Sequence, residues 1–229
     1  MGVASHTQDV KLHHVLRLAH TSHRRFATLE MTIRGWDDVE RIIEAQEVDR
    51  DGAEVQEPRE SLIRMWIDCG SSGAGGRAVW RPRRYRVEAG DVVMVSDLPR
   101  WWVVDRDQAT VRSWEEAAPG VSGADDVADP WFHLPDVSWL KRWRGVAVRG
   151  RTEVAGRPAV LVAARNTMLD IIPGSDRMML ALDLERGVLL RAECFLRDVL
   201  LGVEEVVEIA FDRPLSDDLF EQPGLQKPS

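Results

Sequence analysis

The stretch that decides the fold is residues 148–220. It reads VRGRTEVAGRPAVLVAAR (148–165), RMMLALDLERGVLLRAECFL (177–196) and VEEVVEIAFDRPLSDDLF (203–220). Four apolar, β-rich runs are separated by turn residues at 155–156, 173–174, 185–187 and 201–202. Short runs of this kind, joined by glycine-containing turns, are typical of an antiparallel meander in which each strand is hairpinned to the next.

The side chains of this stretch alternate between two faces, because successive residues of a strand point to opposite sides of the sheet. We expect one face to carry Met178, Leu180, Leu182 and Leu184, and the other to carry Met179, Ala181 and Asp183. In the last strand, Val207, Ile209 and Phe211 are expected on one face. By the same rule Trp101 and Trp102 must point to opposite faces of their strand. One buried face and one wetter face are typical of an antiparallel sheet that is covered on one side.

Upstream of the meander, the sequence predicts a helix followed by further strands. Apolar residues recur at helical spacing over residues 9–22, and a second amphipathic helix is expected over 135–143. Strand-like runs occupy residues 29–33, 61–68, 80–88, 91–97 and 100–105. We expect mobile loops over 46–60, 69–77 and 115–130, where charged, small or glycine- and proline-rich residues concentrate. No boundary divides the chain, so we predict one domain over residues 1–229 with an ordered core over 9–222.

Composition and charge exclude several classes of protein. The formal net charge of −8 argues against a nucleic-acid groove. No secretory leader, lipobox cysteine or stretch long enough to span a membrane is present, so we expect a cytoplasmic protein without a transmembrane segment. Cys69 and Cys194 have no metal-ligand spacing; two free thiols are favoured, and a single disulfide between them is the alternative. Nine tryptophans favour a roomy interior or a binding surface.

No motif in the chain predicts catalysis or a metal site. His13, His14, His20 and His23 could bind zinc, but no cysteine or second histidine pair stands nearby, and a solvated helix is favoured. The glycine-rich run at 69–76 lacks the Lys-Ser/Thr ending of a phosphate-binding loop and the spacing of a nucleophile elbow around Ser72. The sequence therefore predicts no catalytic residues, no metal and no cofactor.

Adjacent charged residues are interpreted as structural. The carboxylate pairs at 37–38, 125–126 and 217–218 favour capping and solvation over acid–base or metal chemistry, since neighbouring residues rarely converge on one substrate. The basic cluster Arg81, Arg83, Arg84 and Arg86 favours pairing with acidic residues across strands. Binding of an anionic headgroup by this cluster is the alternative.

The order of several segments resembles the LolA/LppX-like lipoprotein-carrier superfamily, particularly its actinobacterial members. The segments are the leading helix and strand, Trp80–Glu88, Val95–Asp97 with Arg100–Trp102, Gly150–Ala159, Leu182–Arg191, and Ile209–Asp212 with Phe220. They cover residues 9–222. The resemblance implies a strongly curved antiparallel sheet, an open half-barrel, whose concave side is closed by helices around an acyl chain or another hydrophobic ligand.

We therefore expect an α+β domain with a curved sheet of about eight to eleven strands and helices over its concave face. Its expected function is non-catalytic binding of a lipid or acyl chain in a hydrophobic cavity. The expected cavity residues are Leu29, Met31, Ile33, Met65, Ile67, Trp102, Trp139, Leu180, Leu182, Ile209 and Phe211. The alternative is a protein-interaction or regulatory scaffold with a filled core, which would bind a protein partner through loops or a strand edge.

Overall fold

A computed structural model describes residues 10–38, 40–42, 58–70, 82–97, 100–114, 134, 144–165 and 175–224. The predicted helix over 135–143 and most of the predicted loops over 46–60, 69–77 and 115–130 lie outside the described residues. The described part contains α-helix α1 (Leu12–His20), a further helical stretch over residues 40–42, two short 3-10 helices, η1 (Ser22–Arg24) and η2 (Asp217–Phe220), and eleven strands. No helix there is long and apolar enough to cross a membrane.

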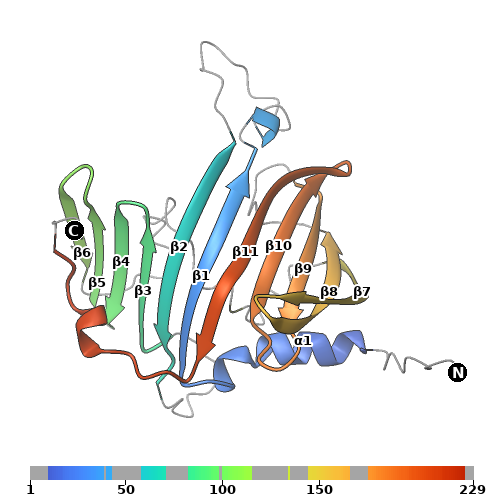
Figure 1. Ribbon diagram of the computed structural model, residues 1–229, viewed down its shortest axis with the longest axis horizontal. Coiled ribbons are helices and arrows are strands. Elements are labelled where there is room, and N and C mark those ends of the chain that lie inside the picture. Colours follow the sequence, from blue (N-terminus) through green and yellow to red (C-terminus); the bar gives the residue numbers. More distant parts are fainter. Residues whose placement is uncertain are drawn as a thin grey trace, which may run out of the picture.

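All eleven strands form one antiparallel sheet (Figure 1). The strands are β1 (Thr28–Asp37), β2 (Arg59–Asp68), β3 (Arg84–Ala89), β4 (Val92–Asp97), β5 (Arg100–Asp105), β6 (Thr110–Trp114), β7 (Arg144–Val154), β8 (Arg157–Arg165), β9 (Arg177–Asp183), β10 (Leu189–Leu196) and β11 (Val199–Phe211). Their order across the sheet is β6-β5-β4-β3-β2-β1-β11-β10-β9-β8-β7. The first and last strands are neighbours at the centre, and consecutive hairpins extend from them to both sides. The predicted single curved, open antiparallel sheet is confirmed.

The hairpin turns follow the sequence prediction at one end of the meander and depart from it at another. Ala155 and Gly156 both have positive φ angles, of 51° and 70°, as a tight two-residue hairpin requires. The predicted turn at 201–202 is wrong, because these residues lie inside β11. The chain reverses instead at Arg197 and Asp198, with φ angles of 47° and 70°. Asp tolerates the left-handed region because its short side chain can bond its own backbone.

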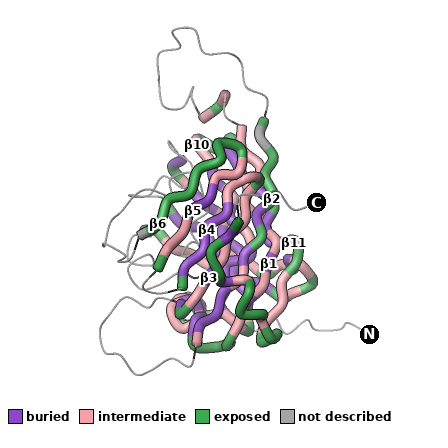
Figure 2. Tube along the Cα trace, turned by 90° about the vertical axis from the view of Figure 1, so that its left-hand side faces the viewer, coloured by how far each residue is buried: buried purple, intermediate pink, exposed green. Residues whose placement is uncertain are grey.

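Burial alternates along the central strands, as predicted (Figure 2). In β1, Leu29, Met31 and Ile33 are buried, while the residues between them are half-buried. The equivalent positions of β2 are Ile63, Met65 and Ile67. We call the face that carries these six residues the Met31 face.

Three hydrophobic clusters hold the sheet in place. The first contains the Met31 face, together with Ala159, Ala181, Val188 and Leu190 from the β7–β10 part. The second packs Val15 and Ala19 of α1 against alternate residues of β8, β9 and β10. The third packs Phe220 of η2 against Val93 and Val95 of β4. Among the described residues, α1 and η2 therefore contribute to the second and third clusters, and the expected helical cover over the first cluster is not seen in this part of the chain.

Bulges interrupt the ladder at the centre of the sheet and in the meander. The register of β1 with β11 shifts between Thr32 and Ile33, which pair with Glu208 and Val206. Val206 therefore lies opposite Ile33, and Val207 is the extra residue without a partner in β1. A second bulge lies in β10 between Leu189 and Arg191. Because a bulge places two residues opposite one, it shifts the side-chain alternation that a sequence pattern assumes.

Candidate ligand-binding face

The Met31 face is built from side chains that stand beside one another across six strands. The strand register aligns them in three rows: Phe211–Leu29–Ile67–Tyr85–Ser96–Trp101, Ile209–Met31–Met65–Val87–Met94–Val103, and Val206–Ile33–Ile63–Ala89–Val92–Asp105. Cross-strand neighbours of this kind are in side-chain contact and stabilise a sheet. The middle row is apolar throughout and contains three methionines, whose unbranched side chains adapt to irregular surfaces.

The centre of this face is tightly covered. Leu29, Ile33, Met65 and Ile67 are at most 1% exposed. Leu134, the one described residue between 115 and 143, belongs to the same cluster and is 2% exposed. The ends of the rows are more open: Ala89, Val92 and Trp101 on one side, and Ile209 and Phe211 on the other, are only partly buried.

The structure divides the eleven expected cavity residues among different clusters. Seven lie on the Met31 face or pack against its cluster: Leu29, Met31, Ile33, Met65, Ile67, Ile209 and Phe211. Leu180 and Leu182 belong to the second cluster, beneath α1. Trp102 packs in the third cluster. Trp139 lies outside the described residues.

The displacement of Leu180 is not a change of face. The register aligns Leu180 with Ala192, Glu204 and Gly35, and Gly35 alternates with Met31 and Ile33 on the same face of β1. Leu180 and Leu182 nevertheless pack in the second cluster, because α1 covers this part of the sheet. Trp101 and Trp102 do point to opposite faces, as predicted, and Trp101 is the one that packs against the first cluster.

Sequence reasoning missed the contribution of β3, β4 and β5 to this face. Tyr85, Val87, Met94 and Val103 are all at most 5% exposed and belong to the first cluster. The signal was present in the sequence, because Tyr85 and Val87 alternate with charged residues. The charged residues Arg84, Arg86 and Glu88 alternate with them in β3 and lie on the opposite face.

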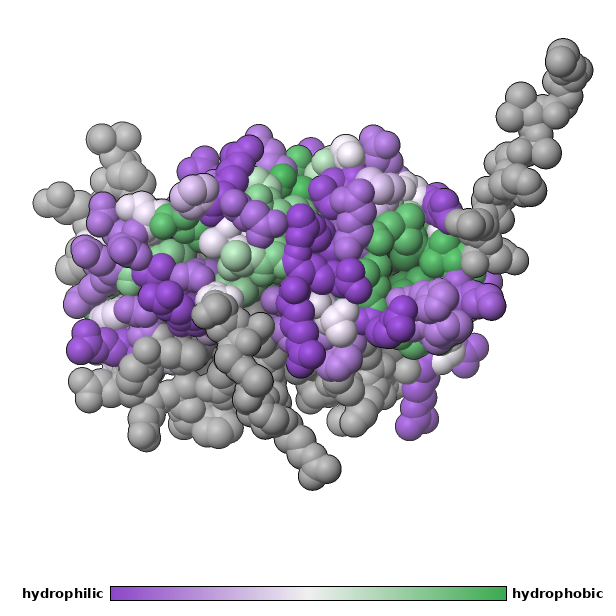
Figure 3. Space-filling model, turned by 90° about the horizontal axis from the view of Figure 1, so that it is seen from below, coloured by the Kyte–Doolittle hydropathy of each residue, from purple (hydrophilic) through white to green (hydrophobic). Residues whose placement is uncertain are grey.

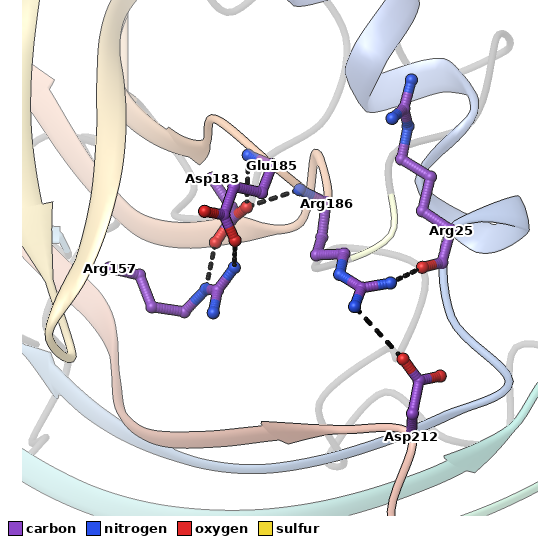
Figure 4. A network of polar contacts seen from close by, with 6 residues as sticks. All are labelled: Arg25, Arg157, Asp183, Glu185, Arg186 and Asp212. Atoms are coloured by element: carbon purple, nitrogen blue, oxygen red, sulfur yellow. Dashed lines mark hydrogen bonds and ion pairs between the residues drawn. The ribbon is translucent and has the colours of Figure 1, made fainter.

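An ion-pair network lies at the Phe211 end of the Leu29 row (Figure 4). Phe211 lies under two guanidinium groups, at 4.9 Å from Arg157 and 5.3 Å from Arg186. Arg157 pairs with Asp183, which is fully buried, and with Glu185 at 2.8 Å. Arg186 pairs with Asp212 at 3.2 Å and donates a hydrogen bond to the Arg25 carbonyl.

Asp183 is the centre of this network. Its Oδ1 accepts hydrogen bonds from the backbone N–H groups of Glu185 and Arg186, at 2.8 and 2.5 Å. The carboxylate therefore holds the β9–β10 turn and Arg157 at the same time. Both guanidinium groups already have carboxylate partners, so we interpret the network as a connection between the meander and the end of β11.

Two residues of the basic cluster upstream, Arg84 and Arg86, form ion pairs, and Arg81 lies outside the described residues. Arg84 bonds its cross-strand neighbour Asp68 at 2.8 Å and Asp217 of η2 at 2.6 Å, and it stacks over the Phe220 ring at 4.4 Å. Arg86 pairs with Glu88. The predicted cross-strand pairing is thus confirmed for Arg84, and its second partner fastens the C-terminal segment to the third cluster.

The remaining candidate residues are the histidines near the N-terminus and the two cysteines. Among the described residues, no three His, Cys, Asp or Glu side chains come together to hold a metal ion. The rings of His13 and His14 are tilted against each other with centroids 4.1 Å apart, and the neighbouring His13 lowers the pKa of His14. Cys69 and Cys194 are not joined in a disulfide and are buried in different clusters. Burial, aided by Asp68 and Asp212, raises the pKa of Cys69 to about 12.

Several solved structures have a fold similar to that of this chain. No protein-family model matches the sequence, and the curated proteins yield no significant match. A solved structure of MucB matches with a TM-score of 0.56 and 19% identity over 91% of this chain. The Pseudomonas aeruginosa MucA/MucB complex matches with a TM-score of 0.55 and 18% identity over 91% of this chain.

An uncharacterized conserved protein from Thermus thermophilus matches with a TM-score of 0.50 and 15% identity, over 92% of this chain and 93% of that protein. By contrast, the chain covers only 62% of MucB and 60% of the matched chain in the complex. At sequence identities of 15–19%, these matches show a shared fold and nothing further. LolA-superfamily proteins are also among the structures that match. The structures that match with TM-scores of 0.50 or more show that this chain shares their fold, in which a curved, open antiparallel sheet agrees with the sequence prediction.

Proposed function

We propose that this chain is a non-catalytic binding protein for a hydrophobic ligand, a lipid or an acyl chain, which it holds along the Met31 face. The observation that carries the proposal is the set of three cross-strand rows, which gives one face of an open sheet a nearly continuous apolar surface across six strands. Ligand sites are mostly apolar with a few polar groups that orient the ligand. The resemblance of the sequence to the LolA/LppX-like superfamily supports the same function.

The methionines at the centre of the face suit this role. Met31 and Met65 are direct cross-strand neighbours, and Met94 lies two strands away in the same row. A flexible thioether can change rotamer to admit a chain of variable shape at small cost. Because the central side chains are covered, a ligand would enter at a partly buried end of the rows and displace part of the cover that includes Leu134.

The surface provides a physical reason for such uptake. Seen from below, the side that holds α1 shows hydrophobic residues between hydrophilic ones (Figure 3). Partly buried apolar side chains lie at the margins of both the first and the second cluster, among them Phe211, Leu161, Leu16 and Val148. These margins offer an amphiphile a first contact before it reaches the interior.

Two cysteines provide a test that separates the Met31 face from the rest of the core. Cys69 lies in the first cluster and Cys194 in the second, and both are nearly buried. A ligand on the Met31 face should slow alkylation of Cys69 by more than it slows alkylation of Cys194. The rates would be measured by mass spectrometry with and without dodecanoic acid, alongside native mass spectrometry of protein purified from its own host. Protein that never carries an apolar molecule, with equal effects on both thiols, would rule the proposal out.

A second candidate function is protein binding through the same fold with a filled core. The observation that favours it is the near-complete burial of Leu29, Ile33, Met65 and Ile67, since a face already packed needs no ligand. MucB, which shares the fold, is known from a structure in complex with MucA. A pull-down from the native host that returns one stoichiometric protein and no lipid would favour this function over the first.

A further inference from the structure

The Leu29 row changes character at its β3–β5 end. Its neighbours there are Tyr85, Ser96 and Trp101, which the register places side by side on three adjacent strands. Tyr85 and Ser96 are at most 2% exposed. The Tyr85 and Trp101 rings meet edge to face, with centroids 5.2 Å apart. Three polar side chains therefore gather at one end of an otherwise apolar row.

The indole N–H of Trp101 has no hydrogen-bond acceptor among the described residues, although its Nε1 atom is buried. An indole nitrogen can only donate, so it needs an oxygen or a similar acceptor. Leaving a buried donor unpaired is costly, and native proteins rarely do so without a functional reason. Trp66, on the opposite face, illustrates the usual arrangement: its Nε1 donates to Glu30 at 3.2 Å.

No described residue accepts a hydrogen bond from the Trp101 indole. The Tyr85 hydroxyl makes a long contact of 3.9 Å with the Met94 sulfur, which is a weak acceptor. Trp101 itself is only partly buried, at the open end of the first cluster. A ligand that lies along the row with its chain toward Met31 would bring its polar end to this indole.

We propose that Trp101 is the polar anchor of the ligand site and that its indole N–H donates a hydrogen bond to the acyl oxygen of a bound fatty acid or fatty-acid ester. This rests on the proposed binding of a hydrophobic ligand along the Met31 face and adds the chemical class of the ligand. Carbonyl and carboxylate oxygens are both acceptors without a competing donor, which matches a site whose free group is a donor. An apolar body with one oriented polar contact is the usual composition of a small-molecule site.

The test compares Trp101→Phe with Trp102→Phe. Both variants lose one indole N–H and keep an aromatic ring, but Trp102 packs on the opposite face, in the third cluster. The ligands are dodecanoic acid, its methyl ester and dodecane, measured by displacement of a fluorescent fatty acid. We expect Trp101→Phe to weaken the acid and the ester by about 3- to 10-fold, the effect of one hydrogen bond, and to leave dodecane unchanged. Trp102→Phe should change none of the three affinities.

The possible outcomes separate this inference from the proposed function. Loss of affinity for the ester as well as the acid identifies the shared acyl carbonyl as the acceptor, whereas loss for the acid alone identifies the carboxylate. Equal affinities in wild type and Trp101→Phe overturn the anchor while leaving hydrophobic binding intact. Failure of wild-type protein to bind any of the three overturns both.

A measurement on unaltered protein covers the case in which Trp101→Phe does not fold. In protein labelled with ¹⁵N at the indole nitrogens, one tryptophan N–H resonance should move downfield with dodecanoic acid and keep its position with dodecane. If no indole resonance responds to the acid, the proposal is wrong.

Discussion

Asp183 is the residue whose replacement should most clearly reveal how the meander is fastened to the centre of the sheet. Its carboxylate is fully buried, pairs with Arg157 and accepts the backbone N–H groups of Glu185 and Arg186. Substitution by Ala removes all three interactions at once. Substitution by Asn keeps an oxygen for the turn N–H groups but removes the negative charge.

The magnitudes follow from these contacts. Removing one partner of a buried ion pair costs about 3–5 kcal/mol. Arg157 keeps Glu185 and is partly exposed, so its share of that penalty is reduced by solvent. We therefore expect Asp183→Ala to lower the free energy of unfolding by about 3 kcal/mol, with the two freed turn N–H groups included. Asp183→Asn should cost about 1–2 kcal/mol, the difference between a charged and a neutral hydrogen-bond acceptor.

Urea denaturation followed by tryptophan fluorescence and circular dichroism would measure both values. The matched control is Asp212→Asn, at the exposed end of the same network. Asp212 is 44% exposed and pairs with Arg186 at 3.2 Å, and such surface pairs contribute at most about 1 kcal/mol. Asn also keeps an oxygen for the hydrogen bond that Asp212 accepts from the Ala27 N–H.

The order of the three variants decides the outcome. The reasoning predicts the greatest loss for Asp183→Ala, an intermediate loss for Asp183→Asn and the smallest for Asp212→Asn. If Asp183→Ala unfolds at the same urea concentration as Asp212→Asn, the buried network does not fasten the meander, and the assignment of its role is refuted.

Three further predictions concern backbone geometry, acid and alkali. Gly187 has a φ of +76°, and a Cβ there would lie 2.3 Å from the Leu18 carbonyl oxygen. We therefore expect Gly187→Ala to lower the free energy of unfolding by about 2 kcal/mol or more. The control is Gly90→Ala, where a Cβ meets open space and the expected loss is about 1 kcal/mol. Equal losses in thermal melts would show that α1 does not constrain this turn. The hydrogen bond from Arg84 lowers the pKa of Asp217, so the contact between η2 and β3 is retained above the carboxyl's ordinary pKa and lost as pH falls through its lowered folded pKa. Hydrogen exchange of the η2 amides should accelerate in that acid range, and no acceleration down to full protonation would contradict the pairing. Burial raises the pKa of Cys69 to about 12, above its ordinary value of 9.0. The stability that the buried neutral thiol contributes is therefore complete below pH 9 and is lost as pH rises toward 12. Rapid alkylation of Cys69 in folded protein at pH 8 would refute this.

The sequence by itself determined the strands of the meander and the alternation within each of them. Met178, Leu180 and Leu182 share one face of β9, and Trp101 and Trp102 point apart, as their positions in a strand require. The Ala155–Gly156 turn was also readable, because few residue pairs accept two positive φ angles. These features depend on neighbours in the chain, which a linear pattern records directly.

Only the tertiary structure decided which faces meet. The two-residue alternation of a strand shows that neighbouring side chains point to opposite faces, but it does not show what each face contacts. Leu180 and Leu182 were therefore expected beside Met31, whereas they pack beneath α1. The bulges at Val207 and Leu190 shift the alternation without a clear sequence signal. The polar end of the Leu29 row arises only when β3, β4 and β5 pair in register, because Tyr85, Ser96 and Trp101 are 11 and 5 positions apart in the chain and become neighbours through the sheet.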